Sequence, residues 1–171
     1  MIIQISGRFA RWLKDADPYG PVSFEVMKYA LSVLINLLLV VGLCLLIGYI
    51  DGKFVETVVA VCSFVGLRMF SGGFHFKSLE VCVIASVALL TAVPVLSPYV
   101  LGHSVWLGGL SLLLVLLKAP TSISGTRLTE RHKPLFKAIS AVIVCTNFFI
   151  GSPVIAISFL LQSLLLIPRR R

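Results

Sequence analysis

The sequence predicts an all-α integral membrane protein with about six transmembrane helices, some of them short, and an N-terminal amphipathic helix at the membrane interface. Of the 171 residues, 58% are hydrophobic, and the mean hydropathy is +1.02, which is far outside the composition of soluble domains. The hydrophobic residues form runs between polar turns, and the first run is long enough to cross a hydrocarbon core of about 30 Å. Lys and Arg outnumber Asp and Glu by 15 to 7, an excess that in a membrane protein reports orientation first.

The first predicted element is an amphipathic helix within residues 1–20. Apolar side chains share one face of this helix, and polar or basic side chains occupy most of the other face: Ile2, Ile5, Phe9, Trp12 and Leu13 against Gln4, Arg8, Arg11 and Lys14. We expect the helix to lie on the anionic cytoplasmic leaflet. An ordinary amphipathic helix packed on the protein's own loops would show the same pattern. The stretch has no continuous apolar core, so we predict no cleavable signal peptide.

Six apolar runs follow, and each predicts one membrane span. They cover residues 29–50, 54–69, 81–96, 105–117, 138–150 and 154–167. Ser23 is placed to cap the first span, and we expect Asn36 within that span to hydrogen-bond to another helix rather than to touch substrate. The last two runs flank Gly151-Ser152-Pro153 and predict a hairpin, with one kinked helix as the alternative.

The distribution of basic residues predicts a multi-pass membrane protein with both termini in the cytoplasm. With six spans, Lys53 is the only basic residue in an outer loop, and the other fourteen face the cytoplasm. The longest polar loop, residues 118–137, has one acidic residue, Glu130, against five basic ones: Lys118, Arg127, Arg131, Lys133 and Lys137. No internal repeat or long linker divides the chain, so we predict a single membrane domain over residues 1–171.

Four cysteines are scattered through apolar sequence. They form no CxxC pair and no cluster with histidine at metal-ligand spacing, which argues against a disulfide framework or a zinc site. We therefore expect no metal and no cofactor, and we expect no nucleic-acid partner. Free cysteines are usually buried and inert, and this is the role we predict for Cys44, Cys62 and Cys145.

The segment from residue 68 to residue 86 carries the candidate chemistry, in the order RMFSGGFHFKSLEVCVIAS. A cysteine thiolate is a strong nucleophile, and a nearby imidazole is the usual means of generating it. We predict that His75 and Cys82 form this pair. In an unbroken helix these residues would lie about 10 Å apart along the axis, which is too far for proton transfer. The pairing therefore requires a loop over residues 71–78, with a turn at Gly72-Gly73 and a helix that begins after Ser78.

Neighbouring residues suggest supporting roles. Positive charge from Arg68 and Lys77 favours the thiolate form of Cys82, although Glu80 opposes it. Ser86, one helical turn beyond Cys82, is a candidate to orient the substrate, but packing or a bond to its own helix backbone is an equal alternative. The predicted topology places this segment and the basic loop together on the cytoplasmic side.

This pattern resembles the accessory gene regulator B family of bacterial membrane cysteine endopeptidases. Members carry an arginine, a Gly-Gly-x-His motif, a cysteine seven residues after the histidine and a serine four residues after the cysteine. The matching residues are Arg68, Gly72, Gly73, His75, Cys82 and Ser86. The resemblance extends more loosely over nearly the whole chain, including Ala119-Pro120 at the start of the basic loop. Two departures are Phe76, where a small residue is common, and a loop after Pro120 that is rich in Ser and Thr.

The resemblance implies a function. Family members cut the C-terminal part from a small precursor peptide, and an internal cysteine of that peptide then attacks the acyl-enzyme to give a thiolactone quorum-sensing signal. It also suggests a homodimer. An acidic tail on the precursor would suit Lys77 and the basic residues of the 118–137 loop, although that loop could serve only topology and anionic lipid.

A rival interpretation is a non-catalytic membrane protein, such as a small transporter or a lipid- or peptide-binding subunit. Transporters usually place their polar groups near the middle of the membrane. This chain places them at one face, which favours the peptidase.

Overall fold

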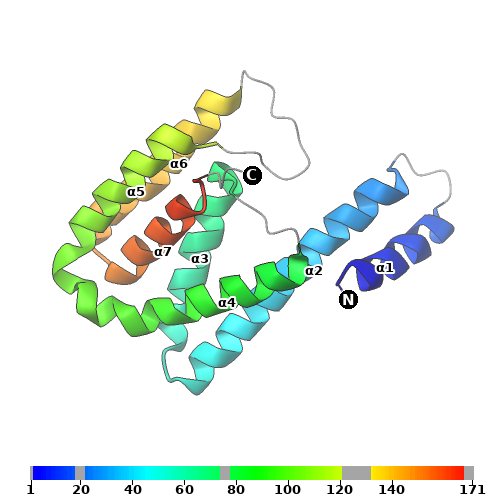
Figure 1. The fold of residues 1–171 in the computed structure, drawn as a ribbon, viewed down its shortest axis with the longest axis horizontal. Helices are drawn as coiled ribbons and strands as arrows, with labels where there is room; N and C mark the ends of the chain where they lie inside the picture. The colour runs from blue at the N-terminus through cyan, green and yellow to red at the C-terminus, as the bar shows by residue number, and fades with distance from the viewer. Residues whose placement is uncertain (1, 18–21, 74–77, 121–131, 168–171) are drawn as a thin grey trace.

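A computed structural model describes residues 2–17, 22–73, 78–120 and 132–167, and the described residues form helices joined by short turns. The prediction of an all-α fold is confirmed (Figure 1). In chain order, the helices are α1 (Ile2–Ala16), α2 (Phe24–Ile50), α3 (Phe54–Ser71), α4 (Leu79–Leu96), the 3-10 helix η1 (Ser97–His103), α5 (Ser104–Lys118), α6 (Lys133–Ile150) and α7 (Pro153–Leu164).

Four helical stretches in the described part of the chain are long and apolar enough to cross a membrane. They are α2, α3, α6 and the run Leu79–Lys118, in which η1 joins α4 to α5. The chain bends sharply at η1, so α4 and α5 run in different directions (Figure 1). α7 has 12 residues and rises about 18 Å, which is shorter than a hydrocarbon core of about 30 Å. The membrane character of the protein is supported, but the predicted count of six spans is not confirmed.

Helix α1 lies alongside the first half of α2 (Figure 1). Its small residues Ser6, Gly7 and Ala10 are buried, and the Ser6 hydroxyl lies 2.7 Å from the Ser32 hydroxyl of α2. Small side chains allow this close approach. The apolar face that the sequence predicts for α1 stays largely uncovered by protein, since Trp12 is 67% exposed. α1 therefore packs on a helix rather than on loops, and its interfacial position remains a prediction.

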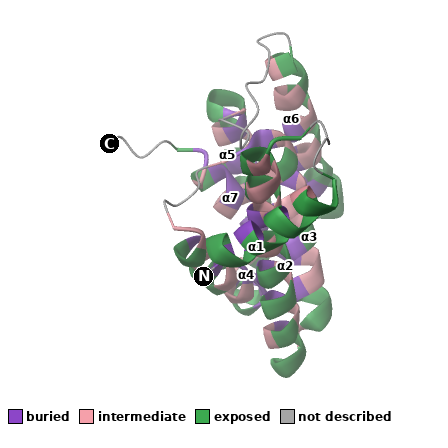
Figure 2. Ribbon diagram, turned by 90° about the vertical axis from the view of Figure 1, so that its right-hand side faces the viewer, coloured by how far each residue is buried: buried purple, intermediate pink, exposed green. Residues whose placement is uncertain are grey.

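The short helix α7 lies between α3 and α5 and forms much of the core (Figure 1). Most of its residues are buried, namely Val154, Ala156, Ile157, Ser158, Phe159, Gln162 and Ser163. By contrast, exposed residues cover much of α2 (Figure 2). A helix that is apolar and buried on most sides is expected at the centre of a bundle.

The turn between α2 and α3 is tight. Gly52 has a φ of 66°, a conformation that glycine adopts without strain, and Gly48 packs directly on the Thr57 side chain. Lys53, the one basic residue predicted for an outer loop, donates from Nζ to the Pro94 carbonyl oxygen at 3.1 Å. The end of α4 therefore lies at the same level as the start of α3.

Helices α6 and α7 form the predicted hairpin. α6 ends at Gly151, whose φ of 68° is left-handed, and the chain then reverses direction (Figure 1). The Asn147 side chain holds the turn, because Nδ2 donates to the Ser152 carbonyl at 3.2 Å and Oδ1 accepts from the Ser152 N–H at 3.2 Å. Ser152 then caps α7 by accepting from the Ile155 N–H. The hairpin is confirmed and the kinked helix is excluded.

The predicted extent of the basic loop is wrong at its second end. The sequence placed residues 118–137 in one loop, but α6 begins at Lys133. Pro134 lies in the first turn of α6, where its fixed φ suits a helix and its missing N–H needs no partner. Five residues of the predicted loop, from 133 to 137, are therefore helical.

Candidate functional site

The turn between α3 and α4 begins as the sequence predicts. α3 ends at Ser71, and the next two residues have positive φ angles, 73° at Gly72 and 151° at Gly73. Residues with a Cβ rarely adopt these angles. α4 begins after Ser78, and the Cys82 N–H donates to the Ser78 carbonyl at 3.1 Å. His75 and Lys77 lie outside the described residues, so the distance between His75 and Cys82 remains a prediction.

Cys82 is in the first turn of α4, 5% exposed, and borders a cavity of about 230 Å³ between α2, α3 and α4. Arg68, Gly72 and Ser86 border the same cavity. Four residues of the sequence motif therefore meet at one place. Most of the remaining lining is apolar: Val33, Leu37, Val40, Phe64, Val65, Met69 and Leu90.

The face of α4 that borders the cavity repeats once per helical turn. Cys82, Ser86 and Leu90 are four residues apart and all line the cavity, as the helix period requires. The prediction that Ser86 lies one turn beyond Cys82 on the same face is confirmed. Among the described hydrogen bonds, Thr91 of α4 bonds back to the Val87 carbonyl, but Ser86 makes no such bond.

Arg68 reaches this cavity from the last turn of α3. Its guanidinium carbon lies 5.8 Å from the centre of the Phe64 ring, and Nη1 donates to Gln162 Oε1 of α7 at 3.2 Å. A cation over an aromatic face and a hydrogen bond to an amide both restrict the side chain. Arg68 is therefore a positioned charge beside the cavity that Cys82 borders.

Gln162 is the residue of this region that the sequence analysis missed. It is fully buried, and its Nε2 donates to the Gly72 carbonyl at 2.6 Å and to Ser71 Oγ at 3.1 Å. A Cβ at Gly73 would lie 3.2 Å from both Gln162 Nε2 and Arg68 Nη1. Gln162 therefore links α7 to the arginine and to the start of the glycine turn. Its signal in the sequence was a polar amide within an apolar helix, which at membrane depth is costly and tends to mark function.

Asn36 also borders the cavity. The prediction that it hydrogen-bonds to another helix is wrong for its side-chain oxygen. Its Oδ1 is buried and has no hydrogen-bond partner among the described residues. The residues of α3 and α4 that line the cavity with it are mainly apolar, so they offer few donors.

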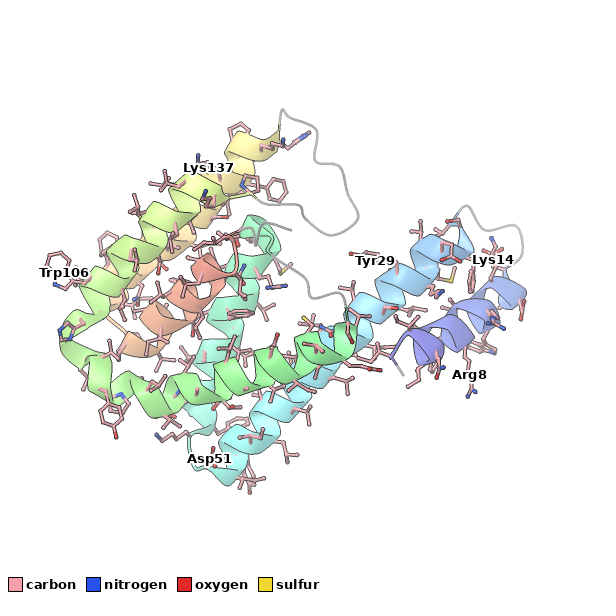
Figure 3. The ribbon with its side chains drawn as sticks, in the orientation of Figure 1. Arg8, Lys14, Tyr29, Asp51, Trp106 and Lys137 are labelled. Carbon is pink, nitrogen blue, oxygen red and sulfur yellow. The ribbon has the colours of Figure 1, made fainter. Side chains whose placement is uncertain are left out.

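Of the basic residues predicted to bind substrate, the structure describes Lys118 and Lys133, and neither lines this cavity. Lys118 is the exposed last residue of α5, and Lys133 is the half-buried first residue of α6. Lys137 lies at the opposite end of the molecule from Asp51 (Figure 3). Arg127 and Arg131 lie outside the described residues. The described part of the basic segment therefore gathers at one end of the α5–α6 pair.

The other cysteines differ in their surroundings. Cys44 is buried and Cys145 is partly buried, but Cys62 is exposed on α3. The prediction that Cys62 packs in the core is therefore wrong, because its place on α3 faces away from the neighbouring helices. All four cysteines are free, and no group of three or more His, Cys, Asp or Glu residues could hold a metal within the described ranges.

The sequence model of one protein family, Accessory gene regulator B, matches residues 6–166. The chain belongs to the accessory gene regulator B family. The match extends from α1 to just beyond α7, so it includes Asn36, the glycine turn, Cys82 and Gln162. No curated protein and no solved structure matches the chain. Membership in the accessory gene regulator B family carries a role in accessory gene regulator processing and, in general terms, a precursor peptide as substrate.

Proposed function

We propose that this accessory gene regulator B protein is a membrane cysteine endopeptidase that cleaves a small precursor peptide on its C-terminal side. The observation that carries the proposal is the position of Cys82, in the first turn of α4 and on the wall of a cavity that Arg68, Gly72 and Ser86 share. A nucleophile needs access, a nearby positive charge and a space for the reacting carbonyl. The cavity offers each of these.

His75 is the proposed base. The nearest described residues before and after it in the chain are Gly73 and Ser78, and both lie beside the site. Because consecutive Cα atoms are 3.8 Å apart, the His75 Cα lies within about 8 Å of the Gly73 Cα and about 11 Å of the Ser78 Cα. These upper bounds allow the imidazole to reach Cys82, which supports the proposed pairing.

The first chemical step forms an acyl-enzyme. His75 takes the proton of the Cys82 thiol, and the thiolate attacks the carbonyl carbon of the scissile peptide bond. The carbon–sulfur bond forms, the carbon–nitrogen bond breaks, and the imidazolium gives its proton to the departing amine. The C-terminal fragment leaves, and the N-terminal fragment stays on Cys82 as a thioester.

The second step transfers the acyl group. We propose that the thiol of an internal cysteine in the bound peptide attacks the thioester, forms a thiolactone ring and returns a proton to Cys82. One thioester replaces another, so ring closure needs no outside energy source. The product is a cyclic peptide of the kind that acts as a quorum-sensing signal, and water in place of the internal thiol would give the linear acid.

The proposed partners follow from charge and location. We propose a precursor with an internal cysteine and an acidic C-terminal tail, since the chain has a net charge of +8 and Lys118 and Lys133 lie at the ends of neighbouring helices. Lys77, Arg127 and Arg131 complete the proposed basic surface. We also propose that α1 contacts anionic lipid and that the protein forms a homodimer. The site and both termini would lie on the cytoplasmic side of the membrane.

The test is co-expression in a bacterial host with a short peptide that has an amphipathic start, a central cysteine and an acidic, tagged C-terminus. We expect the intact chain to release the tail and Cys82→Ser to release none, because the serine hydroxyl is a much weaker nucleophile than a thiolate. Mass spectrometry of the N-terminal product separates the thiolactone, one water lighter, from the linear acid.

The matched control is Cys62→Ser, which changes an exposed cysteine on α3 and should leave release of the tail unchanged. Equal processing by Cys82→Ser and by the intact chain would remove the peptidase proposal. It would leave the rival, a non-catalytic transporter or binding subunit.

A further inference from the structure

Asn36 lies near the middle of α2, in a stretch where nearly all neighbours are apolar. It borders the same cavity as Cys82, on the wall that α2 forms with Val33, Leu37 and Val40. A polar amide at such a position is expensive, and polar residues within membrane helices usually have a partner. The question is what that partner is.

The described structure provides none for the amide oxygen. Asn36 Oδ1 is buried and unpartnered, and it is the one such side-chain atom in the described part of the chain. The buried hydroxyl of Ser32 on the same helix is satisfied, since it donates to the Lys28 carbonyl at 2.8 Å and contacts Ser6. Gln162 across the bundle is satisfied through both ends of its amide. A buried acceptor without a donor is rare in folded proteins. This oxygen is therefore available to a donor on a bound ligand.

We propose that Asn36 binds the substrate: its Oδ1 accepts a hydrogen bond from a main-chain N–H of the peptide that occupies the cavity beside Cys82. This inference rests on the proposed function. A neutral N–H suits the site better than a cation does, because Arg68 already brings a positive charge to the same cavity. The mostly apolar lining lowers the local dielectric constant, which strengthens such a bond. The bond would hold the peptide main chain in one register while its carbonyl faces the thiol.

The probe is a peptide aldehyde, acetyl-Leu-Leu-leucinal, which adds reversibly to a cysteine thiol, compared with analogues in which each amide nitrogen is methylated in turn. Binding is measured as protection of Cys82 from alkylation by iodoacetamide, in full-length protein that carries Cys62→Ser and Cys145→Ser. We expect one methylation to weaken binding by about tenfold in this background, the size of one hydrogen bond. In the same background, Asn36→Leu should bind that methylated analogue and the unmethylated aldehyde equally well.

A second measurement separates a binding role from a structural one. Asn36→Leu removes an unpartnered buried acceptor, so its thermal unfolding temperature should equal or exceed that of the parent protein. Leu37→Ala, at the next position along the same cavity wall, removes no hydrogen-bonding group. It should therefore weaken the binding of the methylated and the unmethylated aldehyde by the same factor, so that the ratio of their affinities stays unchanged.

Two results would overturn the inference. One is that Asn36→Leu still binds the unmethylated aldehyde more tightly than the methylated analogue. The same holds if no methylated analogue binds more weakly than the unmethylated aldehyde to the protein that keeps Asn36. The other is a clear drop in unfolding temperature for Asn36→Leu, which would give the amide a structural partner. Failure of the proposed function looks different, since it appears as peptide cleavage by Cys82→Ser or as no protection of Cys82 by any aldehyde.

Discussion

At the scale of single residues, Gln162 hydrogen-bonds to three groups at the edge of the candidate site. Its amide accepts from Arg68 Nη1 and donates to the Gly72 carbonyl and to Ser71 Oγ. The last carbonyls of a helix have no partner within the helix, and α3 ends where the candidate site begins. Gln162 hydrogen-bonds to the C-terminal end of α3 and to Arg68. It therefore positions both without contacting the reacting atoms.

Replacing Gln162 tests this positioning role. We expect Gln162→Leu to lower the stability by about 1–3 kcal/mol, because it removes the buried amide that bonds to both the Gly72 carbonyl and the Arg68 guanidinium. Thermal unfolding in detergent measures the stability, and release of the peptide tail measures the activity. We expect kcat to fall well beyond the fraction of protein that unfolds, with little change in KM.

Ser163→Ala is the control for Gln162→Leu, because Ser163 is the next residue of α7, is equally buried, and donates to the Phe159 and Ser111 carbonyls rather than to the candidate site. It should lower the unfolding temperature without a matching fall in kcat. A Gln162→Leu protein with reduced stability and an unchanged kcat would make Gln162 a structural residue only.

At the scale of the helices, close packing between α2 and α3 places two walls of the cavity. The contact depends on Gly48, where an added Cβ would lie 2.7 Å from Thr57 Cβ and closer still to its hydroxyl. Real Cβ atoms do not approach side chains so closely, so a larger residue must push the helices apart. Because the Thr57 hydroxyl donates to the Lys53 carbonyl, the turn would be strained as well.

Gly48→Ala should therefore destabilise the protein by about 1–3 kcal/mol through overpacking, as measured by thermal unfolding. Gly42→Ala is the matched control on the same helix, since nothing lies within 4 Å of a Cβ added there. Alanine at that site should be neutral or stabilise by about 0.5–1 kcal/mol. If both changes had the same effect, the contact between Gly48 and Thr57 would not limit the approach of the helices.

For the whole molecule, the positions of the helix ends bear on how often the chain crosses the membrane. Lys53 at the start of α3 contacts Pro94 near the end of α4, so α4 returns to the level at which α3 began. α5 then leads away from that level to Lys118 (Figure 1). This arrangement favours three passages between residues 53 and 118 rather than the two that a single 40-residue span would give.

Labelling decides between these counts. In a chain whose four cysteines have been replaced, Lys53→Cys and Lys118→Cys should react with a membrane-impermeant thiol reagent from opposite sides of the membrane. The comparison uses intact spheroplasts and inverted vesicles, and we expect Lys118→Cys to react only in the latter. Reaction of both residues from one side would show an even number of passages and overturn the arrangement favoured above.

Local features were predictable because they depend on neighbouring residues. The break at Gly72-Gly73, the helix start after Ser78, the shared face of Cys82 and Ser86 and the cap at Ser23 all follow from backbone freedom, capping and the helix period. The start of α6 was placed too late because the charged residues before it were taken as loop, although Pro134 in fact favours a first helical turn.

The sequence alone determined that this is a helical membrane protein with a cysteine at the start of a helix after a glycine turn, since hydropathy and backbone preference act over a few residues. Only the tertiary structure decided that Gln162 lies 3.2 Å from Arg68, ninety-four positions away, and that the Asn36 oxygen has no described partner in the cavity. The reason is that such relations arise from how whole helices pack, and no local pattern of residues records that packing.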